Sequence, residues 1–131
     1  MSIVYREGHD VDLDQLAALF NSAGWQERAS DRARLRQQLT GAMFVVSAWE
    51  GSILVGFARA ISDGATNAYI STVAVLPAYQ AQGIGRELMR RLTSGRQGIQ
   101  FVLHARRAVK EFYLKCGFEP AEDMLRIPRR F

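Results

Sequence analysis

Residues 73–92 read VAVLPAYQAQGIGRELMRRL, and this stretch decides how the rest of the chain is arranged. An apolar run typical of a β-strand, residues 70–76, stops at Pro77, and an amphipathic helix opens directly from Gly83-Ile-Gly85. The first N–H groups of a helix have no acceptor within the helix, and the helix dipole places partial positive charge there. Glycine lets the backbone approach a bulky ligand closely. The order of strand, glycine turn and helix therefore predicts an anion site that fits a diphosphate.

The spacing of the glycines separates this turn from two common phosphate-binding motifs. The dinucleotide fingerprint G-x-G-x-x-G would need glycine at Leu88, and no Gly-Lys-Ser/Thr follows as in the nucleotide-triphosphate loop. The pattern present is Gln-x-x-Gly-x-Gly, at Gln80, Gly83 and Gly85. At this point the chain resembles the GCN5-related N-acetyltransferases (GNAT family), whose phosphate-binding motif has this form.

A second stretch, residues 108–118, reads AVKEFYLKCGF and looks like another signature of that family, Phe-Tyr-x-x-x-Gly-Phe. Residues 56–65, the Tyr-Gln-Ala-Gln-Gly turn and Phe112-Tyr113 are also similar to the plastid and cyanobacterial serotonin N-acetyltransferase-like branch. That branch commonly has Trp-Asp where this chain has Ser71-Thr72. The resemblance therefore implies the family and leaves the acceptor open.

The periodicity of the chain predicts one α/β (α+β) domain over residues 1–131, with a mixed, mostly antiparallel sheet. A chain of 131 residues is long enough for one well-packed core. Strands are expected over residues 2–5, 43–49, 53–61, 68–76, 99–104 and 124–127, and helices over 12–23, 31–41, 84–94 and 107–115. We expect the run 99–104 to be buried on both faces and parallel to its neighbour, and Gly41 to cap the second helix. The order, β-α-α-β-β-β-α-β-α-β, is that of the GNAT fold.

Composition narrows the classes of partner. Hydrophobic residues make up 48% of the chain and charged residues 23%, as in ordinary globular domains, and no apolar run is long enough for a membrane helix. The N-terminus has no signal core, so we expect a cytoplasmic protein. The net charge of +4 is spread along the chain, which argues against nucleic acid. The single cysteine, Cys116, rules out a cysteine-based metal cluster, and an exposed sheet edge would suit a homodimer.

The resemblance implies acetyl-CoA as cofactor and a small-molecule or protein amine as acceptor. In the family, coenzyme A lies where the strand before the glycine turn separates from the next strand. The residues thereby implied in cofactor binding are Val73, Ala74, Val75, Gln80, Ala81, Gln82, Gly83, Ile84, Gly85 and Arg86. Tyr113 is the candidate general acid, since a tyrosine of pKa about 10 is protonated at neutral pH. His104, at the end of the next strand, is the candidate base.

The acceptor side of the site is less defined by the residues. The strand before the glycine turn carries no carboxylate, although the family often has a glutamate there. Asp63 is either a ligand for the amine or part of a Ser-Asp-Gly turn, and Trp25 and Trp49 belong either to the core or to the pocket wall. The missing carboxylate motivates an alternative in which the chain senses acyl-CoA without turnover.

Overall fold

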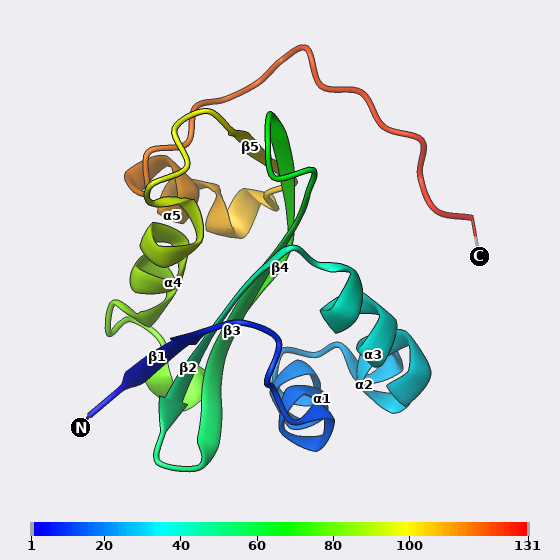
Figure 1. Ribbon diagram of the computed structural model, residues 1–131, viewed down its shortest axis with the longest axis vertical. Helices are drawn as coiled ribbons and strands as arrows, with labels where there is room; N and C mark the ends of the chain where they lie inside the picture. Colours follow the sequence, from blue (N-terminus) through cyan, green and yellow to red (C-terminus); the bar gives the residue numbers. More distant parts are fainter. Residues whose placement is uncertain (1, 131) are drawn as a thin grey trace.

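The computed structural model describes residues 2–130, which form a five-stranded sheet with helices on both faces (Figure 1). The strands are β1 (Val4–Glu7), β2 (Phe44–Glu50), β3 (Ile53–Ser62), β4 (Asn67–Val75) and β5 (Gln100–Leu103). They lie side by side in sequence order; β1 to β4 are antiparallel, and β5 is parallel to β4. The mixed, mostly antiparallel sheet expected from the sequence is therefore confirmed.

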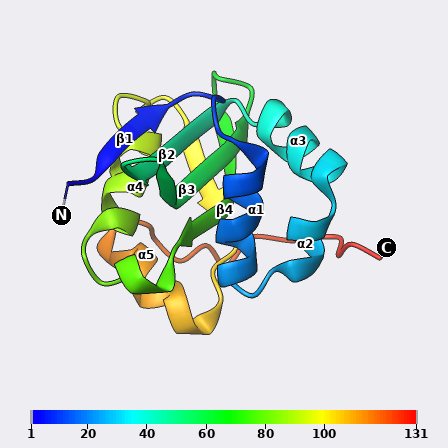
Figure 2. The same cartoon turned by 90° about the horizontal axis from the view of Figure 1, so that it is seen from below.

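The helices divide between the two faces of this sheet (Figures 1 and 2). They are α1 (Leu13–Ser22), α2 (Gln26–Ser30), α3 (Arg32–Gly41), α4 (Ile84–Thr93) and α5 (Lys110–Lys115), with 3₁₀ turns at Pro77–Tyr79 and Arg107–Val109. Helices α1 to α3 cover one face and α4 and α5 the other. No helix within residues 2–130 combines the length and the apolar character needed to cross a membrane.

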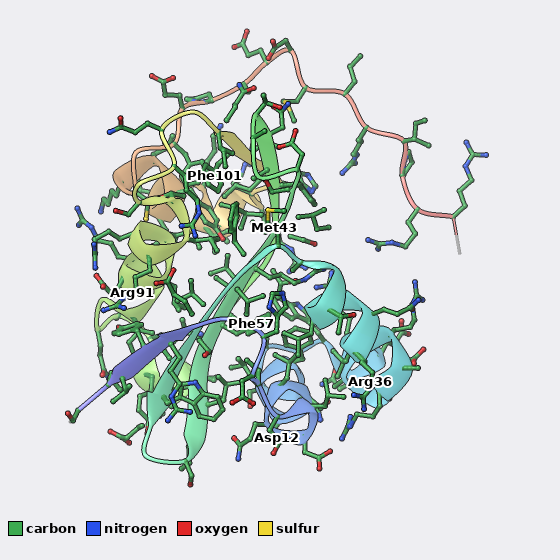
Figure 3. The ribbon with its side chains drawn as sticks, viewed as in Figure 1. Asp12, Arg36, Met43, Phe57, Arg91 and Phe101 are labelled. Atoms are coloured by element: carbon green, nitrogen blue, oxygen red, sulfur yellow. The ribbon has the colours of Figure 1, made fainter. Side chains whose placement is uncertain are left out.

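Each face has its own apolar core. Phe57 of β3 is fully buried between the sheet and α1, where its ring lies 6.2 Å from that of Phe20 (Figure 3). On the other face, Leu88 and Leu92 of α4 are fully buried against β2, β3 and β4. A Cβ at Gly56 would lie 3.1 Å from Leu88 Cδ1, so glycine there lets α4 pack close to β3. The start of α4 is thereby fixed relative to the sheet.

The expected helix boundaries hold in part. Asp12 caps α1 by accepting the N–H of Asp14, and Gly117, with φ of 98°, ends α5 in the left-handed region. Gly41 does not act as a left-handed cap, because it is the last residue of α3 and is not among the described residues with positive φ. The short helix α2 was not predicted from the sequence, since its five residues are too few for a periodic pattern.

Two expectations about the strands are wrong. Residues 124–127 form no strand, and Leu125 and Ile127 are 96% and 90% exposed, because this segment leaves the body of the domain after α5 (Figure 1). The strand expected over 99–104 is the shorter β5, which is parallel to β4 as predicted but only half-buried. With no strand from the C-terminal segment beside it, β5 is an edge strand within the described chain.

Candidate active site

Strand β4 has an edge that is only partly paired. Its ladder with β5 covers Asn67 to Ile70, whereas β4 itself continues to Val75. The Leu76 N–H donates to the Val55 carbonyl of β3, so by the alternation of a strand the polar groups of Val73 and Val75 face away from β3. The two parallel strands thus separate where the sequence placed the gap.

A turn with free backbone donors follows this open edge. Within residues 2–130, the amide N–H groups of residues 81–86 donate no hydrogen bond. They include the first turn of α4, where the helix dipole adds partial positive charge. Six successive free donors at a helix start form an anion site.

The backbone conformation of this turn leaves room for a ligand. Gly83 has φ of 84°, and a Cβ built on it would meet no heavy atom within 4 Å. Ala81 has φ of 62° and is the only non-glycine residue with positive φ among those described. Gly85 has a packing reason to be glycine, because a Cβ there would lie 3.1 Å from Cζ of Phe112.

The side chains around the turn complete its fit to a diphosphate. Gln80 Nε2 donates to the Val75 carbonyl at 3.0 Å and so ties the turn to the end of β4. This is a positioning role that its place in the sequence motif did not reveal. Arg86 is exposed in the first turn of α4 and forms no ion pair within residues 2–130. A cationic side chain beside free amides suits a phosphate, so the residues present fit coenzyme A.

Tyr113 packs on the same face of the sheet as the turn. Its ring lies 5.0 Å from that of Phe112, which contacts Gly85, and 5.8 Å from that of Phe118. Its hydroxyl has no hydrogen-bond partner in the described part of the chain, so the structure shows no anchoring role for it. Burial raises the pKa of Tyr113, with a smaller contribution from Cys116. The hydroxyl is therefore a free, protonated donor at neutral pH.

His104 follows directly after β5, at the point where β4 and β5 separate. Its side chain is exposed, and Nε2 lies 3.3 Å from Nη1 of Arg126. Arginine nitrogens only donate, so a hydrogen bond in this contact needs Nε2 as the acceptor. For Nε2 to take a proton from a substrate, the contact with Arg126 must open first.

The three residues left open on the acceptor side have different placements. Asp63 accepts the N–H groups of Ala65, at 2.8 Å, and Thr66, at 2.9 Å, so it holds its own turn. These bonds, with that from the Thr66 hydroxyl, hold the pKa of the Asp63 carboxyl far below its usual range, which makes it a poor base. Trp49 is a core residue, 6% exposed, and its Nε1 donates to Ser47. Trp25 is half-buried with the guanidinium of Arg28 4.8 Å from its ring centre.

Arg59 was not among the residues selected from the sequence. It lies inside β3, is 8% exposed, and donates from Nε to Thr72 Oγ1 and from Nη2 to Ser71 Oγ, each at 3.1 Å. Ser71 lies at a bulge of β4, where the register with β3 shifts. A lone arginine in an apolar strand is the signal that would have singled it out.

The comparisons with known proteins agree with this geometry. Residues 9–126 match the Acetyltransferase (GNAT) domain family. The chain is 36% identical over 129 residues to histone acetyltransferase TAP1 of Glycine max, covering 89% of this chain and 56% of that protein. It is 30% identical over 128 residues to the chloroplastic serotonin N-acetyltransferase 2 of Oryza sativa, covering 94% of this chain and 64% of that protein.

Both relatives are longer, since the chain spans less than two thirds of their length. Among solved structures, a probable acetyltransferase from Staphylococcus aureus superposes with a TM-score of 0.82 and 26% identity, over 98% of this chain and all of that one. The family match covers most of the chain, and the solved structure shares its fold. The chain therefore belongs to the GNAT acetyltransferase family.

Proposed function

We propose that this chain transfers an acetyl group from acetyl-CoA to a primary amine by direct attack of the amine on the thioester. One observation carries the proposal: the free amides of residues 81–86 lie directly after the open edge of β4. Family membership supports acetyl-CoA as the donor in general terms. Because the relatives are longer than this chain, the acceptor is proposed only as a class, amines.

Groups of this chain account for the binding of acetyl-CoA and for the proton that the departing thiolate takes up. Acetyl-CoA would supply the activated acyl group as a thioester. The amides of residues 81–86 bind the diphosphate, and the polar groups of Val73 and Val75 hold the arm along the open edge of β4. The Tyr113 hydroxyl, kept protonated by its raised pKa, donates a proton to the departing thiolate.

The proton of the amine needs a separate acceptor. Strand β4 carries no carboxylate, and Asp63 is held by its turn. His104 follows β5 directly where β4 and β5 separate, so we assign it as the base once Arg126 moves away. His104→Ala should therefore lower kcat more near neutral pH than at alkaline pH, where a larger fraction of the amine is already deprotonated.

The test combines binding with turnover. Acetyl-CoA should raise the Tm, and free thiol should appear with some members of an amine panel. Tyr113→Phe should lower kcat by about 100-fold or more while the Kd for CoA stays the same, because the hydroxyl acts only on the leaving group. Tyr5→Phe, on the far edge strand, is the matched control and should leave kcat unchanged. Absence of both stabilisation and thiol release would reject the proposal.

A sensor of acyl-CoA is the second candidate, favoured by the absence of a carboxylate from β4. It predicts the same stabilisation by acetyl-CoA and the same loss of binding when the turn is altered. The two candidates differ in turnover alone. Stabilisation without thiol release from any amine, in wild type and Tyr113→Phe alike, would establish the sensor.

A further inference from the structure

Arg59 is a buried cation without a carboxylate partner. Its two hydrogen bonds go to the hydroxyls of Ser71 and Thr72, which carry no charge. No ion pair within residues 2–130 includes it. Burying a charge without a counter-charge is costly, and most proteins avoid it. The arrangement makes physical sense when an anion is supplied from outside.

Arg59 lines a surface pocket. This pocket lies between α3 and β3, has a volume of about 280 Å³, and is lined by Arg34, Gln37, Gln38, Gly41, Arg59 and Ile61. Nη1 of Arg59 has no hydrogen-bond partner in the described chain. Every fully buried side-chain nitrogen in that part of the chain does have a partner, so Nη1 cannot be fully buried. Nη1 is therefore the accessible donor.

The lining has the composition of an anion site. Arg34 adds a second, exposed guanidinium, and two glutamines add amide donors, whereas no acidic side chain lines the pocket. The nearby carboxylate of Asp31 accepts the backbone N–H of Arg34 as the cap of α3. Two arginines that line one pocket favour a carboxylate or a phosphate, which guanidinium groups bind with paired hydrogen bonds.

More positive charge surrounds this face of the sheet. Burial lowers the pKa of Arg59, and the neighbouring charge of Arg28 lowers it further, against a smaller opposite effect of Tyr69. Burial also lowers the pKa of Arg28, with added effects of Arg129 and Arg106. These cations repel one another, and a bound anion would relieve that repulsion.

The pocket also stands in the right place for an acceptor. Arg59 is the register partner of Thr72, and Thr72 is adjacent to Val73, whose polar groups face the open edge of β4. The pocket lies on the face covered by α1 and α3, whereas the turn of residues 81–86 leads into α4 on the opposite face. An acceptor in the pocket and coenzyme A at the turn can therefore approach β4 from opposite faces of the sheet.

We propose that the pocket between α3 and β3 binds an anionic group of the acceptor, so that the protein acetylates amines that carry a carboxylate or a phosphate. This inference rests on the proposed acetyl transfer. Two paired sets of acceptors test it by thiol release: α-amino acids against their carboxamides, and O-phosphoethanolamine against ethanolamine. The first set isolates the carboxylate and the second the phosphate. Serotonin and a lysine-rich peptide serve as cationic acceptors.

The variants test the pocket itself. Arg34→Gln removes one guanidinium from an exposed position, and should raise KM for the anionic acceptors by about tenfold with little change for the neutral ones. Arg36→Gln is the matched control, because Arg36 is two residues further along α3, about 200° round the helix, and does not line the pocket. Arg59→Lys keeps the charge but loses the planar guanidinium with its paired donors, and should weaken binding of the same anionic acceptors.

A binding measurement keeps the test independent of turnover. O-Phosphoethanolamine and an α-amino acid are titrated calorimetrically into wild type, Arg34→Gln and Arg36→Gln in the presence of saturating CoA. Tighter binding by wild type and Arg36→Gln than by Arg34→Gln supports the pocket. Equal binding by all three, or turnover of the neutral partners as efficient as that of the anionic ones, would overturn it. Failure of acetyl transfer would show separately, as absence of thiol release from every amine.

Discussion

The two turns that flank β4 differ in what they do with their backbone donors. In the turn before β4, the Asp63 carboxylate accepts the N–H groups of Ala65, Thr66 and Asn67 at 2.8 to 3.3 Å. In the turn after β4, the N–H groups of residues 81–86 have no acceptor in the described chain. The first turn contains its own anion, and the second lacks one. A turn that serves only the fold satisfies its donors, whereas a turn that serves a ligand leaves them free.

The two turns also differ in backbone strain. Gly64 takes the positive φ of the first turn, 76°, whereas Ala81 adopts φ of 62° in the second. Left-handed backbone costs a residue with a Cβ about 1 kcal/mol. The first turn is thus relaxed and internally bonded, and the second is strained and open. We expect the two turns to respond oppositely to the same kinds of change.

The largest expected effect is a loss of stability when the packing of α4, which holds the second turn in place, is weakened. Leu88→Ala removes a fully buried side chain of α4 and should lower the free energy of unfolding by about 2–5 kcal/mol, because it leaves a cavity against the sheet. Urea unfolding measures this loss. Adding CoA should restore part of the lost free energy of unfolding. A loss below about 1 kcal/mol would mean that α4 does not depend on this packing.

The next largest expected effect is weaker CoA binding when a carboxylate is introduced into the second turn. Ala81→Asp places a carboxylate beside the free amides and should weaken CoA binding by at least about tenfold, through competition and charge repulsion. Ala81→Asn has the same shape without the charge and tolerates positive φ equally well. Calorimetry of both variants with CoA decides: equal affinities would contradict a diphosphate at this turn.

The converse change removes the anion from the first turn. Asp63→Asn should lower the Tm at neutral pH while leaving the Kd for CoA unchanged. The lowered pKa of Asp63 in the folded protein means that its stabilisation is complete above the unfolded value of about 3.9 and is lost as the pH falls below it. The difference in Tm between wild type and Asp63→Asn should therefore shrink below about pH 4. A difference that persists in acid would assign the stabilisation to shape alone.

The smallest effect is relief of strain in the second turn. Ala81→Gly should raise the free energy of unfolding by about 0.5 kcal/mol at most, because glycine adopts positive φ without a Cβ clash but also has a freer unfolded chain. CoA affinity should change little. Thermal unfolding with and without CoA measures both, and destabilisation by this substitution would show that Ala81 is not strained.

How far the sequence predicted these features depends on whether a feature is local. The strand, the turn at Gly83 and the amphipathic helix α4 follow from a short stretch, and the structure has them where they were expected. The strand expected over residues 124–127 has the right composition, but a strand also needs a neighbour, and none pairs with it. The Asp63 turn was one of two readings of Ser-Asp-Gly, and only its hydrogen bonds decide between them.

The acceptor side was least predictable because it is built from separate elements. Arg59 comes from β3, Ser71 and Thr72 from β4, and Arg34 from α3, and only folding brings them together. The bulge that presents Ser71 depends on the register between β3 and β4, which periodicity alone does not reveal. The sequence motif also did not reveal that the Gln80 side chain donates to the Val75 carbonyl.

The most direct test of the account is an amide ¹H–¹⁵N spectrum recorded during parallel titrations with CoA and with pantetheine, which lacks the diphosphate. If the free N–H groups of residues 81–86 bind a diphosphate, their proton resonances move downfield with CoA and stay in place with pantetheine, while those of residues 64–67 move with neither. Resonances of residues 81–86 that stay unmoved at saturating CoA would contradict it.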